Sequence, residues 1–398
     1  MQTSKRIGKM QLSPIRRLVP YADEAKKRGI KVFHLNIGQP DIETPKVFMK
    51  AIKEAEIDVL AYADSRGWDP LRQSLVDYYK RIGGDFEIED IIITNGGSEA
   101  LQWAFVITCD IDDEILVPEP FYTNYNSFTA PFTVNIKPIT THAENGFALP
   151  SEEEIVGLIS ERTRCIALSN PGNPTGVIYT REEVEMIAKI AKEHDLYIIA
   201  DEVYREFCYD GKEAVSFSTL EDVKDRVIIV DSVSKRFSAC GARIGCIASK
   251  NKDVTLGALK MAQGRLSAPT LEMIGAKALY DLEPDYFDPI RERYQRRRDV
   301  MIDAMQEMEG VMIKRPAGAF YAIASLPVDN AEKFAIWMLS EFEHEGKTVM
   351  VAPVENFYAT KNMGLNEARV AYVLNEESLH EAMKILDIAL KAYPGRTI

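Results

Sequence analysis

The feature that most constrains the fold is an alternation of short apolar runs and longer amphipathic segments between residues 91 and 248. Each run is rich in Ile, Val and Leu, which is typical of a strand buried on both faces. The runs lie at 91–94, 115–117, 164–168, 196–200 and 227–230. Strands that alternate with helical segments predict an α/β fold with a mainly parallel sheet and helical crossovers. Ligands of such sheets bind beyond the carboxyl ends of the strands.

The last of these runs brings a lysine to that edge of the sheet. Residues 227–230 are followed by Asp231-Ser232-Val233-Ser234-Lys235, and Arg243 comes shortly after. A lysine there can form a Schiff base with a carbonyl compound, while serine hydroxyls and an arginine can bind a phosphate. A Ser-x-x-Lys spacing alone also fits a lysine in a solvated loop. The residues in the other turns are therefore needed to distinguish a Schiff-base lysine from a solvated one.

Four other turns place polar groups at the same edge. Asn95-Gly96-Gly97-Ser98 follows the first run and precedes a helix, an arrangement that offers backbone N–H groups to a phosphate. This turn matches neither a Walker loop nor a dinucleotide fingerprint, which argues against nucleotide binding. The runs at 115–117, 164–168 and 196–200 lead respectively to Tyr122, to Asn173, and to Asp201 with Tyr204.

Composition and charge exclude several classes of function. The chain has 48 basic and 61 acidic residues, a net charge of −13, which argues against a general partner of nucleic acid or of an anionic membrane. Its five cysteines form no Cys-x-x-Cys pair, and its five histidines show no ligand spacing, so neither a disulfide framework nor a metal site is expected. The cysteines are interpreted as reduced thiols of a cytoplasmic protein. No apolar run reaches the length of a membrane span.

With 398 residues, the chain is too long for one ordinary core. We expect an N-terminal arm with part of a small domain at 1–45, a large domain at 46–284, and a C-terminal small α+β domain at 285–398. The charged segment from residue 284 to about 308 is predicted to be a solvated helix between the domains, because acids interleave its arginines. Residues 14–28 predict another helix, with Ser13 as its cap and Gly29 as its end.

Taken together, the strand-end motifs resemble the class I and II aminotransferases, which are pyridoxal-phosphate enzymes of fold type I, and aspartate aminotransferases in particular. The motifs that carry the resemblance are Asn173-Pro174-Thr175-Gly176, Asp201-Glu202-Val203-Tyr204, Ser232-Val233-Ser234-Lys235, Arg243 and Arg369. Their order and spacing match from about Gly38 to Arg369. The resemblance implies a large pyridoxal-phosphate-binding domain with a mainly parallel seven-stranded sheet flanked by helices, and a smaller α+β domain.

The resemblance also implies roles for the residues around the cofactor ring. Lys235 would hold pyridoxal 5'-phosphate as a Schiff base and then shuttle the substrate proton. Asp201 would pair with the pyridine nitrogen and keep it protonated. Asn173 and Tyr204 would bind the phenolic oxygen of the ring, and Tyr122 would stack on its face.

Further residues would bind the phosphate and the substrate. The family pattern assigns the phosphate to Gly97, Ser98, Ser232 and Arg243, and adds a tyrosine of the partner subunit, which corresponds to Tyr62. The resemblance therefore implies a two-fold homodimer with shared active sites, and cis peptides before Pro120 and Pro174. Arg369 would bind the α-carboxylate of the substrate in a two-pronged contact, assisted by Gly38 and by Asn173.

The expected reaction is transfer of an amino group from an L-amino acid, aspartate or another acidic or aromatic one, to a 2-oxo acid such as 2-oxoglutarate. A lysine that commonly binds the distal carboxylate in the bacterial aspartate branch is replaced here by Ser98. We hypothesise that Arg265 of the partner subunit supplies the missing charge; a surface arginine at a helix end is the alternative interpretation. Two other functions stay open: a pyridoxal-phosphate lyase acting on C–S bonds, and a non-catalytic sensor.

Overall fold

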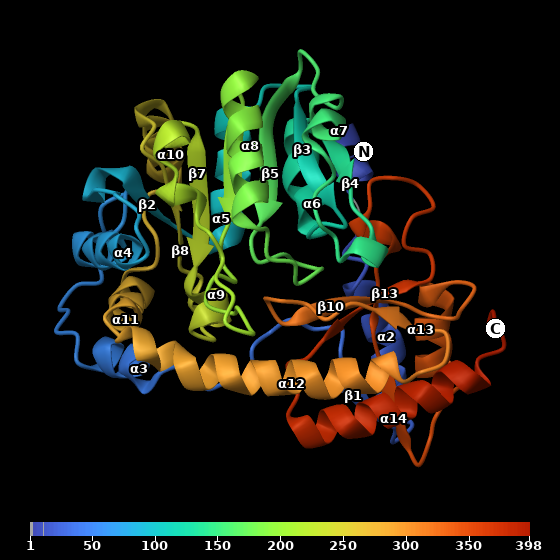
Figure 1. The fold of residues 1–398 in the computed structure, drawn as a ribbon. Coiled ribbons are helices and arrows are strands. Elements are labelled where there is room, and N and C mark those ends of the chain that lie inside the picture. The colour runs from blue at the N-terminus through green and yellow to red at the C-terminus, as the bar shows by residue number, and fades with distance from the viewer. Residues whose placement is uncertain (1–2, 11) are drawn as a thin grey trace.

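The computed structural model describes residues 3–10 and 12–398, and its centre is a seven-stranded sheet (Figure 1). In spatial order the strands are β2 (Ile91–Thr94), β8 (Gly245–Ala248), β7 (Val227–Ser232), β6 (Tyr197–Asp201), β5 (Thr163–Ser169), β3 (Glu114–Glu119) and β4 (Asn135–Thr140). Neighbouring strands pair in parallel, except that β8 runs antiparallel to β2 and to β7. The predicted α/β class with a mainly parallel seven-stranded sheet is confirmed.

The central strands are apolar throughout because both faces of the sheet are covered. On β7, Val227 and Ile229 belong to one buried cluster, whereas Ile228 and Val230 belong to another. This alternation follows from the two-residue period of a strand. The first cluster includes residues of α4 (Asp69–Arg81), α8 (Arg181–Glu193) and α11 (Thr270–Tyr280), and the second includes residues of α5 (Gly97–Thr108) and α10 (Lys252–Arg265).

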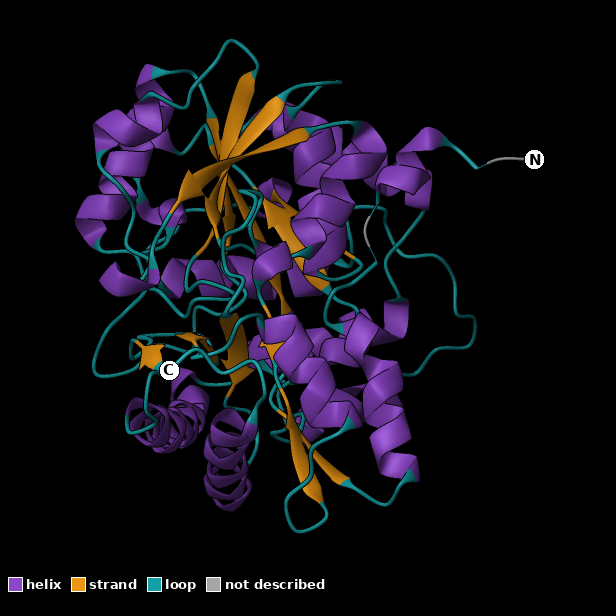
Figure 2. Cartoon of the chain, turned by 90° about the vertical axis from the view of Figure 1, so that its right-hand side faces the viewer, coloured by secondary structure: helices purple, strands orange, loops and turns teal. Residues whose placement is uncertain are grey.

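A second, smaller group of strands lies below the large sheet in Figures 1 and 2. It holds a four-stranded antiparallel sheet of β12 (Ala352–Pro353), β13 (Glu367–Ala371), β10 (Tyr321–Ser325) and β9 (Met312–Ile313), and a parallel pair of β1 (Lys31–His34) and β11 (Lys347–Met350). Its helices are α2 (Val19–Lys27), α12 (Asp288–Gln306), α13 (Ala331–Ser340) and α14 (Glu376–Ala392). The predicted smaller α+β unit is present, while its boundaries at residues 45 and 285 stay a prediction.

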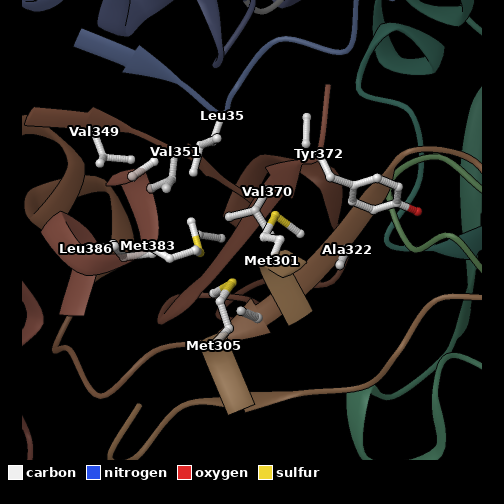
Figure 3. Close-up of a cluster of buried hydrophobic side chains, with 14 of the residues drawn as sticks. Leu35, Met301, Met305, Ala322, Val349, Val351, Val370, Tyr372, Met383 and Leu386 are labelled. Atoms are coloured by element: carbon white, nitrogen blue, oxygen red, sulfur yellow. The ribbon is translucent and has the colours of Figure 1, made fainter. Parts of the chain in front are cut away.

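This second unit has an apolar core of its own, in which Met301 and Met305 of α12 point toward Val370 of β13 and Met383 of α14 (Figure 3). Flexible methionine side chains can fill irregular gaps between a helix pair and a sheet. The remaining helices are short: α1 (Lys5–Lys9), α3 (Lys46–Lys53), α6 (Asn124–Thr129), α7 (Glu152–Val156) and α9 (Val233–Arg236). No helix in the described ranges is both long and apolar enough to cross a bilayer.

Two parts of the chain differ from the sequence prediction. No strand of the large domain was predicted after residue 230, but Gly245–Ala248 forms the buried strand β8, which lies between β2 and β7. The helix predicted at 14–28 begins instead as a 3-10 turn, Arg16–Leu18, which continues into α2. Ser13 still caps this segment, because its Oγ accepts a hydrogen bond of 3.4 Å from the backbone N–H of Arg16.

Helix α12 is less solvated than its charge pattern predicts. Arg298 is only 1% exposed, and its guanidinium donates to both carboxylate oxygens of Asp210 at 2.6 and 2.8 Å and to the Pro316 carbonyl at 3.0 Å. The adjacent Arg297 is also buried and pairs with Asp41. The prediction of a solvated helix is therefore wrong for these two arginines, which tie α12 to segments far away in the sequence.

We expect Arg298→Ala to lower the free energy of unfolding by about 2 to 3 kcal/mol, because the hydrogen bonds of a buried charged group are lost. Arg296→Ala on the same helix is the matched control. Arg296 is largely exposed and pairs with Glu376 at 3.2 Å, so its loss should cost less than about 1 kcal/mol. Urea unfolding followed by circular dichroism measures both values, and equal losses in the two variants would contradict the structural role of Arg298.

Candidate active site

A cavity of about 630 Å³ opens at the carboxyl ends of the central strands, between the large sheet and the smaller unit. It brings together eleven of the thirteen residues that the sequence nominated: Gly38, Gly97, Ser98, Tyr122, Asn173, Asp201, Tyr204, Ser232, Lys235, Arg243 and Arg369. These residues come from segments as far apart as Gly38 and Arg369. Only the fold therefore makes them neighbours.

Lys235 lies on the one-turn helix α9, directly after strand β7. The Ser232 side chain caps that turn by accepting a hydrogen bond of 3.0 Å from the Ser234 backbone N–H. The Lys235 Nζ atom donates to the Gly38 carbonyl at 3.0 Å and lies 6.0 Å from the centre of the Tyr204 ring. The amine thus points into the cavity, toward the turn that follows β1.

The turn that carries Lys235 is held by a buried ion pair. Arg236 contacts Asp231 at 2.7 Å, and neither side chain is exposed to solvent. Asp231 also accepts a hydrogen bond from the Tyr79 hydroxyl at 3.1 Å, and the Arg236 guanidinium lies 4.5 Å from the ring centre of Tyr78. Removing either charge would leave the other buried and unpaired, so the sequence Asp231–Arg236 has little freedom to rearrange.

Asp201 ends strand β6 and is only 6% exposed. Within the described residues its carboxylate accepts one hydrogen bond, from the Val203 N–H at 3.3 Å, and forms no ion pair. Burial raises the pKa of this carboxyl to about 7, although the nearby Lys235 amine acts in the opposite direction. A buried acid of this kind fits a cationic or protonated ligand group.

A chain of hydrogen bonds links Tyr204 to the smaller unit. Its hydroxyl lies 3.0 Å from the Tyr321 hydroxyl and 3.5 Å from the Asn173 amide nitrogen. The Asn173 amide oxygen in turn accepts a hydrogen bond of 3.1 Å from Arg369. Burial, aided by the neighbouring Tyr321, raises the pKa of Tyr204 well above its ordinary value, so the hydroxyl stays protonated and can donate a hydrogen bond.

Arg369 of β13 is 3% exposed and donates to the Asn36 carbonyl at 2.7 Å. Its guanidinium lies 4.5 Å from the ring centre of Tyr321 and 5.3 Å from that of Phe357. Its Nε–H is buried without a hydrogen-bond partner in the described residues. Two aromatic rings and two polar contacts therefore fix the orientation of a guanidinium at the cavity wall, as recognition of a carboxylate requires.

The N-terminus of α5 forms the opposite wall of the cavity with Gly97 and Ser98. The first N–H groups of a helix lack intrahelical acceptors and favour anions. Gly245 is needed for this turn, because a Cβ there would lie 2.7 Å from the backbone nitrogen of Gly97. Arg243, at a φ of 54°, donates to the Asn95 carbonyl at 3.2 Å and brings a positive charge to the same wall.

Tyr122 lines the cavity after the cis peptide Glu119–Pro120. Burial raises its pKa to about 12, and its hydroxyl accepts a hydrogen bond of 2.7 Å from the Asn124 amide. The bonds before Pro120 and Pro174 are cis, as predicted, and the bond before Pro171 is cis as well.

Two nominated residues lie outside the cavity. Tyr62 is 78% exposed, in a loop whose neighbours Val59 and Leu60 are also exposed. Arg265 forms an ion pair of 2.7 Å with Glu99 of its own chain and stacks 5.1 Å above the Trp103 ring. Its charge is thus already balanced within the chain. Its proposed part in substrate binding stays a prediction. The ion pair with Glu99 argues against it, because the guanidinium already has a carboxylate partner.

The cavity-wall residues that sequence reasoning did not nominate include Tyr321, Ser234 and Arg16. Tyr321 begins the apolar strand β10, and nothing in that pattern marks it as a residue of a site. Ser234 belongs to the lysine motif, and its place beside Ser232 was a usable signal. Arg16 falls in a helical pattern that shows no preference for a ligand. In the described part of the chain, no three His, Cys, Asp or Glu side chains are placed to bind a metal ion.

A family model, relatives of known function and solved structures all indicate the same family. The model of the family "Aminotransferase class I and II" matches residues 30–386. The aspartate aminotransferase of Pyrococcus horikoshii is 30% identical over 397 residues, which cover 98% of this chain and 97% of that protein. The aromatic-amino-acid aminotransferase 2 of Thermococcus litoralis is 30% identical over 401 residues, 98% of this chain and 99% of that protein.

Solved structures agree over the same length. The Thermus thermophilus aspartate aminotransferase with maleate has a TM-score of 0.89 at 26% identity, and the Pyrococcus furiosus alanine aminotransferase has a TM-score of 0.90 at 30% identity. Each comparison covers 98% of this chain and 100% of the other. The chain therefore belongs to the class I and II aminotransferases, a family of pyridoxal-phosphate-dependent enzymes.

Proposed function

We propose that this aminotransferase takes the amino group of an acidic L-amino acid, aspartate in the first place, and transfers it to a 2-oxo acid such as 2-oxoglutarate. The observation that carries the proposal is the meeting of the Lys235 amine, the Asp201 carboxyl and the Arg369 guanidinium in one cavity. The relatives named for aspartate support the choice of donor. Others are named for aromatic amino acids and for alanine, so the donor has to be measured.

The donor groups of the cavity fit pyridoxal 5'-phosphate. Asp201 offers a buried carboxyl to the ring nitrogen, and Tyr204 with Asn173 offers polar hydrogens to the phenolic oxygen. The α5 N-terminus with Gly97 and Ser98, together with Ser232 and Arg243, would hold the phosphate. Tyr122 would pack against the ring. When bound, the cofactor draws electrons away from the substrate Cα, which makes its proton easier to remove.

The chain's own residues would orient the substrate and move that proton. Arg369 would grip the α-carboxylate, with the Gly38 backbone beside it, and so fix the Cα–H bond relative to the lysine. Lys235 Nζ would bind the cofactor covalently at rest and accept the Cα proton once substrate takes its place. Tyr321, through its hydroxyl contact of 3.0 Å, would keep the Tyr204 hydroxyl in place.

We also propose a homodimer in which Tyr62 reaches the phosphate site of the partner. The support is the exposure of Tyr62 with its apolar neighbours Val59 and Leu60, a patch that a second copy would cover. The free cysteines of the described chain accord with a reducing compartment, and we propose the cytoplasm as its place of work.

The function is tested by adding single L-amino acids to the cofactor-loaded protein and following its absorbance. Aspartate and glutamate should change the spectrum, and 2-oxoglutarate should restore it. Pyruvate and ammonia released without any 2-oxo acid would show a lyase instead. A spectrum that no amino acid changes would contradict an enzymatic role and favour a sensor.

We expect Lys235→Ala to lower the turnover number by at least about 100-fold, since a positioned general base is lost. Lys192→Ala is the control, because Lys192 is an exposed lysine paired with Asp222 on the surface. Steady-state kinetics with aspartate, and circular dichroism to verify the fold, provide the measurement. Residual activity within tenfold of the wild type would remove Lys235 from the mechanism.

The raised pKa of Asp201 predicts a pH dependence of stability in the cofactor-free protein. The ordinary pKa is 3.8 and the folded value is about 7, so the folded state binds this proton more tightly than the unfolded state. The resulting stabilisation is complete below pH 3.8 and is lost as the pH rises through about 7. Between about pH 5 and pH 8, wild type should lose roughly 2 to 3 kcal/mol relative to Asp201→Asn. Parallel stability curves would contradict the assignment.

Shared active sites predict complementation between two inactive variants. A dimer of one Tyr62→Ala subunit and one Lys235→Ala subunit keeps one site with both residues intact. Unfolding and refolding an equal mixture should therefore recover about a quarter of wild-type activity, since half of the dimers are mixed and each has one working site. The variants refolded separately are the controls. A mixture no more active than its components would rule out the contribution of Tyr62 across subunits.

A further inference from the structure

The charges around the cavity are unlike those of the chain as a whole. Its wall includes four cationic side chains, Arg16, Lys235, Arg243 and Arg369, and one acidic side chain, Asp201. The whole chain has a net charge of −13. A cleft lined mainly by one sign of charge concentrates ligands of the opposite sign. This cavity therefore attracts anionic ligands, although the chain as a whole is acidic.

Three of the four cations have partners at the cavity wall. Lys235 donates to Gly38, Arg243 to Asn95 and Cys240, and Arg369 to Asn36 and Asn173. The Arg16 guanidinium makes no ion pair or hydrogen bond with the residues that the structure describes, and the residue is exposed at the cavity. The contacts proposed above for the cofactor and for the α-carboxylate thus do not involve Arg16.

The local fold directs Arg16, but not its neighbour, to the cavity. Leu18 is 1% exposed and anchors the 3-10 turn in the core of the smaller unit. Arg17 points to the surface, where it forms an ion pair of 2.7 Å with Glu332 at the start of α13. Ser13 and Ile15 line the same cavity as Arg16, so the segment forms part of the wall.

Neither the residue at the position of the family's lysine nor Arg265, suggested above for a distal carboxylate, supplies a free charge. Ser98 is neutral, and Arg265 is neutralised by Glu99 at 2.7 Å. We propose that Arg16 binds the side-chain carboxylate of a dicarboxylic substrate, while Arg369 holds the α-carboxylate. Arg16 thereby sets the preference for acidic over small apolar substrates. This inference rests on the proposed transamination, and it names the residue that selects the substrate class.

The test compares cofactor-loaded wild type with Arg16→Met, Arg16→Lys and the control Arg17→Met. Arg16→Met should lower the ratio of kcat/KM for aspartate to kcat/KM for alanine by at least about tenfold, the effect of losing a hydrogen bond between charged groups. The loss should lie mainly in KM, because both the bound and the reacting substrate carry the carboxylate. Arg16→Lys should recover part of the ratio, and Arg17→Met should leave it unchanged.

Succinate provides a readout that needs no turnover. Isothermal titration should show at least about tenfold weaker succinate binding to Arg16→Met than to wild type, with propionate binding unchanged. An unchanged aspartate-to-alanine ratio together with unchanged succinate affinity would overturn the role of Arg16 while leaving the aminotransferase intact. A wild type that transaminates alanine but no dicarboxylate would overturn it as well. A wild type without any transamination would contradict the proposed function, and succinate binding would still decide for or against Arg16.

Discussion

The structure of the site depends on the buried ion pair between Asp231 and Arg236, on either side of the turn that carries Lys235. Its 2.7 Å contact is fully shielded from water, so each charge stabilises the other at a position where an unpaired charge would be very costly. The Tyr79 hydroxyl and the Tyr78 ring complete the surroundings of the pair. The lysine is therefore presented from a rigid support. The second anchor of the site, Arg369, lies on β13 of the smaller unit and is held by the Asn36 carbonyl and by Asn173 of the large unit.

The cavity depends on both units because each supplies a different set of residues to its wall. The large sheet supplies the groups that suit a cofactor, since its parallel strands all end at one edge. The smaller unit supplies Arg369 and Tyr321, and the segment before α2 adds Arg16. Contacts such as that between the Lys235 amine and the Gly38 carbonyl cross from one unit to the other at 3.0 Å. The residues proposed to bind the substrate thus come mainly from the smaller unit, and those proposed to bind the cofactor ring and its phosphate come from the large unit.

Most of the fold could be predicted from the sequence because the central strands are buried on both faces. Such strands appear in the sequence as continuous apolar runs. The strand at 91–94 was found with its exact bounds, since it sits between clear turns. Strand β4 was missed because its exposed and half-buried residues interrupt the apolar pattern. Strand β8 was missed because its sequence, Gly-Cys-Ile-Ala, contains only one β-branched residue.

The site was predictable where a motif lies at a strand end, as at Asp201 and Lys235. Contacts between distant segments leave no trace in local sequence. The burial of Arg298 against Asp210 and the pairing of Arg265 with Glu99 depend on tertiary packing alone. For the same reason Arg16, within a helical pattern, gave no sign of facing the cavity. Charge patterns along one helix describe its surface only when no other segment covers it.

The most direct test of the account is to locate the cofactor on the chain. Native protein should be reduced with borohydride, digested and analysed by peptide mass spectrometry. The account predicts a single pyridoxyl-phosphate modification, on the side chain of Lys235. A modification at another lysine, or none on protein saturated with the cofactor, would contradict it.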